Sequence, residues 1–181
     1  MEFISQFLQW QEGFQGQVVV DAMRAHVDIP VMFVTLYLTL VFYVPTVISK
    51  PVNCKTFFAV WNLLLAVFSI IGSIHTVPTL VSTVWNHGLR YSACTEPSYF
   101  FNSGVGLWMC LFILSKIPEL MDTVFLVIQK KDVIFLHWFH HVTVMLYCWH
   151  AYTTKISSGL WFATMNYCVH SIMYFYYFLM A

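Results

Sequence analysis

The fold is decided by the segment Val133-Ile-Phe-Leu-His-Trp-Phe-His-His-Val-Thr-Val-Met-Leu-Tyr-Cys-Trp-His-Ala-Tyr152, an apolar stretch that carries three histidines close to its start. Its length matches the about 20 residues that a helix needs to cross the hydrocarbon core of a bilayer. His137, His140 and His141 are spaced i, i+3 and i+4, so they share one face of that helix. Because a membrane segment does not normally carry three imidazoles for packing, this face predicts a functional site.

The composition places the chain in a membrane. Of its 181 residues, 60% are hydrophobic and 9% are charged, whereas about a quarter of the residues of a soluble domain are charged. We therefore predict an all-α fold, a polytopic membrane helix bundle with the lipid bilayer as a partner. The eight basic and eight acidic residues cancel, so neither an acidic tail nor a basic surface for nucleic acid is indicated.

The five cysteines do not predict a metal site. None of them is arranged in a CxxC motif, and most lie in apolar runs where a small buried thiol is ordinary. Cys94 lies in a polar stretch and is the exception, but the sequence does not single out a disulfide partner for it.

Five apolar segments are long enough to be transmembrane helices: 29–48, 56–74, 104–128, 133–152 and 159–180. Residues 1–28 are mixed in character and lack the pattern of a cleaved signal peptide. We expect an N-terminal lumenal segment, 1–28, and one transmembrane domain, 29–181. Pro45 is expected to bend the first span. The polar stretch 75–103, with Gly88 among its helix breakers, is expected to be a loop that can include interfacial helix.

The lysines predict which loops face the cytosol. Lys50 and Lys55 lie between the first two spans, and Lys130 and Lys131 lie between the third and the fourth. The alternate connections carry one basic residue each. The excess of basic residues in cytosolic loops therefore places the two lysine loops in the cytosol and the N-terminus in the lumen or outside.

Polar side chains on three different spans lie at one predicted depth. With a rise of about 1.5 Å per residue, His137 to His141 lie at the level of Glu119 and Asp122 on the third span. Asn166 and His170 lie near the midplane on the fifth span. Each helix keeps these groups on one face, so we predict an internal polar pocket open toward the cytosol. Its candidate residues are Lys116, Glu119, Asp122, His137, His140, His141, Asn166, His170 and Tyr174.

A purely structural interpretation remains open for part of this set. Lys116 and Glu119 are as well explained by a buried ion pair that fixes helix packing. Pro118 between them predicts an interrupted helix, either a simple kink or a break that exposes a carbonyl to the pocket. The histidines are harder to explain in this way, because one structural imidazole is ordinary and four at one depth are not.

Two kinds of chemistry fit the histidines. Imidazole suits iron and zinc, but membrane di-iron enzymes draw on three separated histidine boxes and only one box is present, with His170 alone elsewhere. Two irons are therefore not expected, whereas a single metal remains possible. In the alternative, the histidines act directly as nucleophile and as general acid or base.

Three motifs in this order and separation resemble those of the very-long-chain fatty acid elongase family: Lys116-Ile-Pro-Glu-Leu-Met-Asp-Thr123, His137-Trp-Phe-His-His141 and Asn166-Tyr-Cys-Val-His-Ser-Ile-Met-Tyr174. The resemblance covers most of the chain from about residue 50 onward. It is strongest with the branch that acts on saturated and monounsaturated acyl chains.

The resemblance implies a 3-oxoacyl-CoA synthase, which condenses malonyl-CoA with a fatty acyl-CoA and releases CO₂ and CoA. It implies nucleophile or acyl-carrier roles for His140 and His170, with His137 and His141 as acid, base or orienting partners. The remaining polar candidates, Lys116, Glu119, Asp122, Asn166 and Tyr174, would hold substrate. No metal or other cofactor is needed for this chemistry.

The resemblance also implies a multi-pass protein of the endoplasmic reticulum membrane that associates with other elongases or elongation-cycle enzymes. Members of the family resemble seven-span proteins, so with about five spans this chain is expected to be truncated at its C-terminus. Two alternatives follow. The chain is a catalytically inactive form that acts as a membrane partner of full-length elongases, or it is a single-metal oxidase.

Overall fold

The computed structural model describes residue 6 and residues 10–181 of the chain. Within this part the secondary structure is helical and contains no strand, so the predicted all-α fold is confirmed. The helices are α2 (Gly16–Ala25), α3 (Asp28–Phe42), α4 (Val44–Val47), α5 (Lys55–Cys94), α6 (Ser98–Phe101), α7 (Gly104–Ser115), the 3-10 turn η1 (Pro118–Leu120), α8 (Met121–Ile128), α9 (Phe135–Thr153) and α10 (Gly159–Met180).

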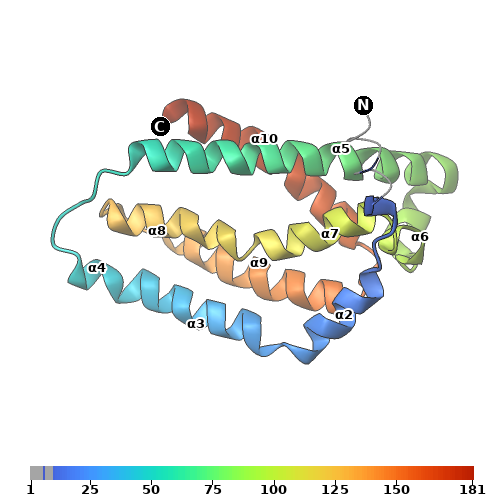
Figure 1. Ribbon diagram of the computed structural model, residues 1–181, viewed down its shortest axis with the longest axis horizontal. Coiled ribbons are helices and arrows are strands. Elements are labelled where there is room, and N and C mark those ends of the chain that lie inside the picture. The colour runs from blue at the N-terminus through green and yellow to red at the C-terminus, as the bar shows by residue number, and fades with distance from the viewer. Residues whose placement is uncertain (1–5, 7–9) are drawn as a thin grey trace.

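The long helices form one elongated bundle (Figure 1). The α3–α4 segment runs along one side of it, α7, α8 and α9 form the middle, and α5 lies on the other side with α10 crossing beneath it. The most extensive helix pair is α5 with α10. The core between these elements is largely aromatic and aliphatic, with Phe112, Leu160 and Tyr167 almost completely buried.

Two helical stretches of the described residues are long and apolar enough to cross a membrane. They are Asp28–Val47, with a mean hydropathy of 1.8, and Lys55–Cys94, with 2.2. In the first stretch the helix changes at Tyr43, where α3 ends and α4 begins. Pro45 lies in the first turn of α4, so the helix is interrupted next to this proline, whose missing N–H cannot continue the helical hydrogen bonds.

The second span was predicted too short. The expected loop after Ile74 is wrong, because α5 continues as helix to Cys94. Polar side chains of α5 form hydrogen bonds within the helix: the hydroxyls of Thr76 and Thr83 donate to the carbonyls of Gly72 and Thr79, four residues earlier. Hydroxyl residues therefore do not end this helix.

Gly88 is the point at which the long α5 helix changes direction. Its φ of 83° and ψ of 166° lie outside the helical region, in a conformation that glycine adopts without steric cost. The sequence identified this glycine as a breaker, and here that expectation is confirmed.

The third span is interrupted at Pro118, as predicted. The α-helix α7 ends at Ser115, a 3-10 turn begins at Pro118, and α8 continues from Met121. In a 3-10 turn the side chains of residues i and i+3 are nearly eclipsed. The interruption therefore directs Lys116 and Glu119 toward the same place.

The last two spans agree with the predicted boundaries, since α9 covers Phe135–Thr153 and α10 covers Gly159–Met180. The connections 48–54 and 129–134 lie at the same end of the bundle (Figure 1). The N–H of Val52 donates to the carbonyl of Ile128 across these two connections, at 2.9 Å. The four lysines of the two loops are thus gathered at one end of the molecule.

At the opposite end, α2 packs onto the bundle. The indole N–H of Trp149 donates to the carbonyl of Met23, and Arg24 donates to the carbonyl of Thr153. Residues 1–5 and 7–9 of the predicted N-terminal segment lie outside the described residues. Its lumenal location stays a prediction.

Candidate functional site

A polar cavity of about 370 Å³ lies between α5, α8, α9 and α10, toward the end of the bundle that carries the lysine loops. All four candidate imidazoles line it, together with two carboxylates. The lining residues are Phe58, Asn62, Glu119, Asp122, Leu126, His137, His140, His141, His170, Met173, Tyr174 and Tyr177.

The three histidines of α9 lie close to one another at the edge of this cavity. The ring centroids of His137 and His141 are 4.7 Å apart, and those of His140 and His141 are 5.8 Å apart. This proximity follows from the i, i+3, i+4 spacing, which places the three rings within about one turn on one helix face. On α10, the ring of His170 contacts that of Tyr174 edge to face, at 5.2 Å.

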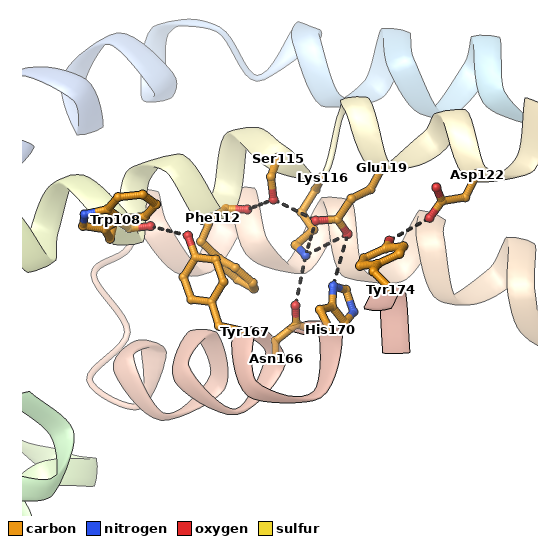
Figure 2. A network of polar contacts seen from close by, with 10 residues as sticks. All are labelled: Trp108, Phe112, Ser115, Lys116, Glu119, Asp122, Asn166, Tyr167, His170 and Tyr174. Atoms are coloured by element: carbon orange, nitrogen blue, oxygen red, sulfur yellow. Dashed lines mark hydrogen bonds and ion pairs between the residues drawn. The ribbon is translucent and has the colours of Figure 1, made fainter. Parts of the chain in front are cut away.

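Lys116 and Glu119 form a buried ion pair beside the cavity (Figure 2). The ammonium group of Lys116 donates to both carboxylate oxygens of Glu119, at 2.8 and 2.9 Å, and to Oδ1 of Asn166 at 3.1 Å. Ser115 adds a hydroxyl bond to Glu119. The Lys116 and Glu119 side chains are 4% and 7% exposed, so each charge depends on the other for compensation.

The ion pair also reaches His170. Nδ1 of His170 lies 4.0 Å from Oε2 of Glu119 (Figure 2). Glu119 therefore stands between a fixed cation on one side and an imidazole on the other.

Asp122 is held by two aromatic donors from different helices. The indole N–H of Trp61 on α5 donates to Oδ1 of Asp122 at 2.8 Å, and the hydroxyl of Tyr174 on α10 donates to Oδ2 at 2.7 Å. Each oxygen thus has one strong bond. The carboxylate is fixed in the wall of the cavity and links α5, α8 and α10.

The structure places seven of the nine predicted site residues in the cavity wall. The other two lie behind it: Lys116 donates to Glu119 of the wall, and Asn166 accepts a hydrogen bond from Lys116. Trp61 and Tyr37, which contact Asp122 and Thr123 respectively, were not predicted as site residues. Each is a lone amphipathic aromatic residue in an apolar span, and such residues are common at these positions for packing alone.

The structure also gives the surroundings of His75 and Cys94, which do not line the cavity. His75 was expected in a loop or at the interface, but it lies in α5 and its ring stacks on Trp108 at 5.0 Å. Cys94 is exposed and forms no disulfide. The other four cysteines are also free thiols, but Cys110 and Cys148 are buried and Cys54 and Cys168 are half-buried.

Among residue 6 and residues 10–181, no three side chains of His, Cys, Asp or Glu are grouped as the ligands of one metal ion. What the cavity does offer is imidazole nitrogens next to fixed carboxylates, with apolar wall residues such as Phe58, Leu126 and Met173. Groups of this kind can supply a nucleophile and can transfer protons.

A helix bundle with apolar outer faces and a histidine-lined cavity defines the class of the protein, an integral membrane protein with a cavity of the kind found in enzymes. Comparison with known proteins specifies the family. Residues 22–181 match the family described as "ELO: GNS1/SUR4 family". The chain belongs to this family.

Individual relatives bear similar names. The chain is 47% identical to "Fatty acid elongase 3" of Trypanosoma cruzi and 46% identical to "Fatty acid elongase 3" of Trypanosoma brucei brucei, over 99% and 100% of its length. It is 36% identical to "Very long chain fatty acid elongase 6" of Gallus gallus over 96% of its length. These alignments cover 68%, 69% and 66% of the three relatives, so the chain spans about two thirds of their length. The predicted resemblance to the fatty acid elongase family is confirmed. The family and the names of these relatives indicate a role in fatty acid elongation in a membrane.

Proposed function

We propose that this chain carries the catalytic centre of a 3-oxoacyl-CoA synthase, which joins a long-chain fatty acyl-CoA to malonyl-CoA and releases CO₂ and CoA. The observation that carries the proposal is the set of four imidazoles, from α9 and α10, that line one cavity with Glu119 and Asp122. The names of the relatives support the same direction of chemistry.

In the proposed reaction an imidazole nitrogen of His140 attacks the thioester carbonyl of the acyl-CoA. The C–S bond breaks, CoA leaves as thiolate and takes up a proton, and the acyl group is bound to His140 as an acyl-imidazole. Malonyl-CoA then loses CO₂, and the electron pair of the broken C–C bond forms a new bond to the acyl carbon. The imidazole leaves and regains from water the proton that it gave up to the CoA thiolate, and the product is a 3-oxoacyl-CoA longer by two carbons. One hard condensation is thereby divided into two easier steps.

The surrounding groups would support these steps in different ways. His170, with Glu119 at 4.0 Å, is suited to proton transfer to the leaving thiolate, or to acyl transfer in place of His140. His137 and His141 would orient the nucleophile. Glu119, Asp122 and Tyr174 would form the polar wall that holds the substrate carbonyls. Lys116, which donates to Glu119, and Asn166, which accepts from Lys116, would support this wall and the bound substrate. No metal enters this mechanism.

The volume of the cavity agrees with a site for the reacting ends of the substrates. Its about 370 Å³ lies near the lower limit of the about 300–1,000 Å³ typical of small-molecule sites. We propose that the thioester and the malonyl group bind there, while the acyl tail extends into apolar space among the helices. CoA would approach from the end that carries the lysine loops, in an endoplasmic reticulum membrane that the chain crosses several times.

The test is formation of an acyl-enzyme and of product by the purified chain in detergent or liposomes. With a radiolabelled acyl-CoA and no malonyl-CoA, we expect label bound to the protein, which mass spectrometry locates on His140. Addition of malonyl-CoA is expected to discharge the label as 3-oxoacyl-CoA.

His140→Ala is expected to lower product formation by about 10³-fold or more, because the nucleophile is removed. His150→Ala is the matched control, since His150 lies on the same helix and is exposed outside the cavity. Equal product formation by wild type and His140→Ala would exclude His140 as the carrier. Acyl-CoA binding without any product would exclude the proposed activity for this chain.

A further inference from the structure

A hydrogen-bond chain connects α3 to the first histidine of α9. The hydroxyl of Tyr37 lies 2.9 Å from Oγ1 of Thr123, and Oγ1 of Thr123 lies 2.8 Å from Nε2 of His137. Both distances are those of ordinary hydrogen bonds between such groups. Tyr37 is 2% exposed and Thr123 is 0% exposed, so bulk water does not compete for these bonds.

The two hydroxyl hydrogens determine which group donates and which accepts in each of these two hydrogen bonds. Each hydroxyl has one hydrogen to donate, whereas a neutral imidazole has one donor nitrogen and one acceptor nitrogen. If Tyr37 donates to Thr123 and Thr123 donates to Nε2 of His137, both hydroxyl hydrogens have an acceptor.

The other arrangements leave a buried hydrogen without an acceptor. In the reverse direction it is the hydrogen of Tyr37, and when Tyr37 and His137 both donate to Thr123 it is the hydrogen of Thr123. For neither is another acceptor found in the part of the chain that the structure describes. A buried donor without a partner is unfavourable, so the first arrangement is favoured.

We propose that Tyr37 and Thr123 are positioning residues that hold His137 as the tautomer with its hydrogen on Nδ1 and with Nε2 occupied. The meaning of this inference for catalysis rests on the proposed function. Because its Nε2 lone pair is engaged, His137 is an orienting residue and not the acyl carrier. Among the described residues no hydrogen bond engages a ring nitrogen of His140, which keeps that imidazole free to attack.

The same tyrosine also braces the third imidazole of α9. The ring centroid of Tyr37 lies 6.0 Å from that of His141, and His141 lies 4.7 Å from His137. Tyr37 therefore restrains His137 through a hydrogen bond chain and His141 through ring contact. The first membrane helix takes part in the site through this one residue.

The direct test is the tautomer of His137, measured by ¹⁵N NMR of histidine-labelled protein in detergent. The spectra are recorded at about pH 8, where histidine with an ordinary pKa near 6.5 is neutral. The His137 signal is identified by its loss in His137→Gln. We expect the hydrogen on Nδ1 in the wild type and in Thr123→Ser, which keeps the hydroxyl.

Thr123→Val has nearly the same shape but no hydroxyl, so it is expected to shift His137 toward a mixture of tautomers. Tyr37→Phe is expected to weaken the preference in the same direction. Thr164→Val is the matched control, because Thr164 is a buried threonine on α10 whose hydroxyl has no partner in the structure as described. It is expected to leave the His137 signal unchanged.

A kinetic measurement distinguishes positioning from general damage to the fold. Thr123→Val is expected to lower kcat for elongation about tenfold or more with little change in KM, and Thr123→Ser is expected to restore it. A hydrogen on Nε2 of His137 in the wild type, or a tautomer unchanged in Thr123→Val, would overturn the inference and leave the proposed function standing. Absence of elongation with the expected tautomer would overturn the proposed function and leave the hydrogen-bond chain standing.

Discussion

At the scale of single residues, the site is built from buried charges that are compensated by short-range partners. Lys116 and Glu119 are the clearest case, because each is nearly inaccessible and is the main charge partner of the other. Asn166 and Ser115 complete the bonds of this pair. In a membrane protein such a pair is costly unless every bond is made, which ties the stability of the fold to the construction of the site.

Removal of one member of the ion pair is therefore expected to lower the free energy of unfolding much more than removal of both members. Lys116→Met leaves a buried carboxylate uncompensated and should lower the free energy of unfolding by about 3–5 kcal/mol. The double variant Lys116→Met with Glu119→Leu should recover a large part of this loss. The measurement is reversible unfolding in mixed detergent micelles, and an additive double variant would contradict the expectation.

A second residue-scale expectation concerns the carboxylate of Asp122. Trp61→Phe removes the N–H that donates to Oδ1 while it keeps an aromatic ring of similar position. Loss of a hydrogen bond to a charged group should cost about 1.5–3 kcal/mol in the same unfolding measurement. Trp85→Phe is the control, since Trp85 is 87% exposed, and an equal effect of the two variants would exclude a special role for the Trp61 bond.

At the scale of elements, the position of α10 depends on close contact with α5. A Cβ built at Gly72 would overlap the ring of Tyr167, and Tyr167 is almost fully buried and donates to the carbonyl of Trp108 on α7. The absence of a side chain at Gly72 thus allows three helices to meet. Since α10 carries His170 and Tyr174, this contact sets where those groups enter the cavity.

Gly72→Ala is expected to displace Tyr167 and to destabilise the protein by about 1–3 kcal/mol, the usual cost of overpacking. Gly159→Ala is the matched control on α10, because the nearest atom to its Cβ would be Cε of Met109 at 3.7 Å. It should change stability by less than about 0.5 kcal/mol. Similar losses for both variants, measured by thermal unfolding in detergent, would show that the contact at Gly72 is not tight.

At the scale of the whole molecule, the two lysine loops lie at one end of the bundle, joined by the bond from Val52 to Ile128. The connection between α9 and α10, which carries Lys155, and the C-terminal part of α5, which carries Arg90, lie toward the other end. This asymmetry predicts the orientation of the chain in a membrane. It also predicts the side from which a charged, water-soluble substrate reaches the cavity.

Orientation is measured with single cysteines in a variant that lacks Cys94, the exposed native thiol. In sealed microsomes a membrane-impermeant maleimide is expected to label Lys131→Cys from the cytosolic side. Lys155→Cys should be labelled only after the membrane is opened. Labelling of Lys155→Cys in intact microsomes, with protection of Lys131→Cys, would reverse the predicted orientation.

The sequence by itself determined the helical membrane class, the boundaries of α9 and α10, the interruption at Pro118 and the common depth of the polar side chains. These features depend on length, periodicity and proline chemistry, which act within one segment. The continuation of α5 beyond Ile74 was not predictable in this way, because its hydroxyl groups bond to the helix that contains them and polarity alone does not distinguish this from a loop.

Only the tertiary structure decided which side chains complete the site. Periodicity gives the face of a helix that carries His137 or Asp122, but not the rotation and register of the neighbouring helix against that face. Tyr37 on α3 and Trp61 on α5 contact Thr123 and Asp122 because packing of the bundle, including the contact at Gly72, fixes those two quantities. The sequence of a helix determines which residues share a face, whereas the neighbour of each face depends on the packing of all helices together.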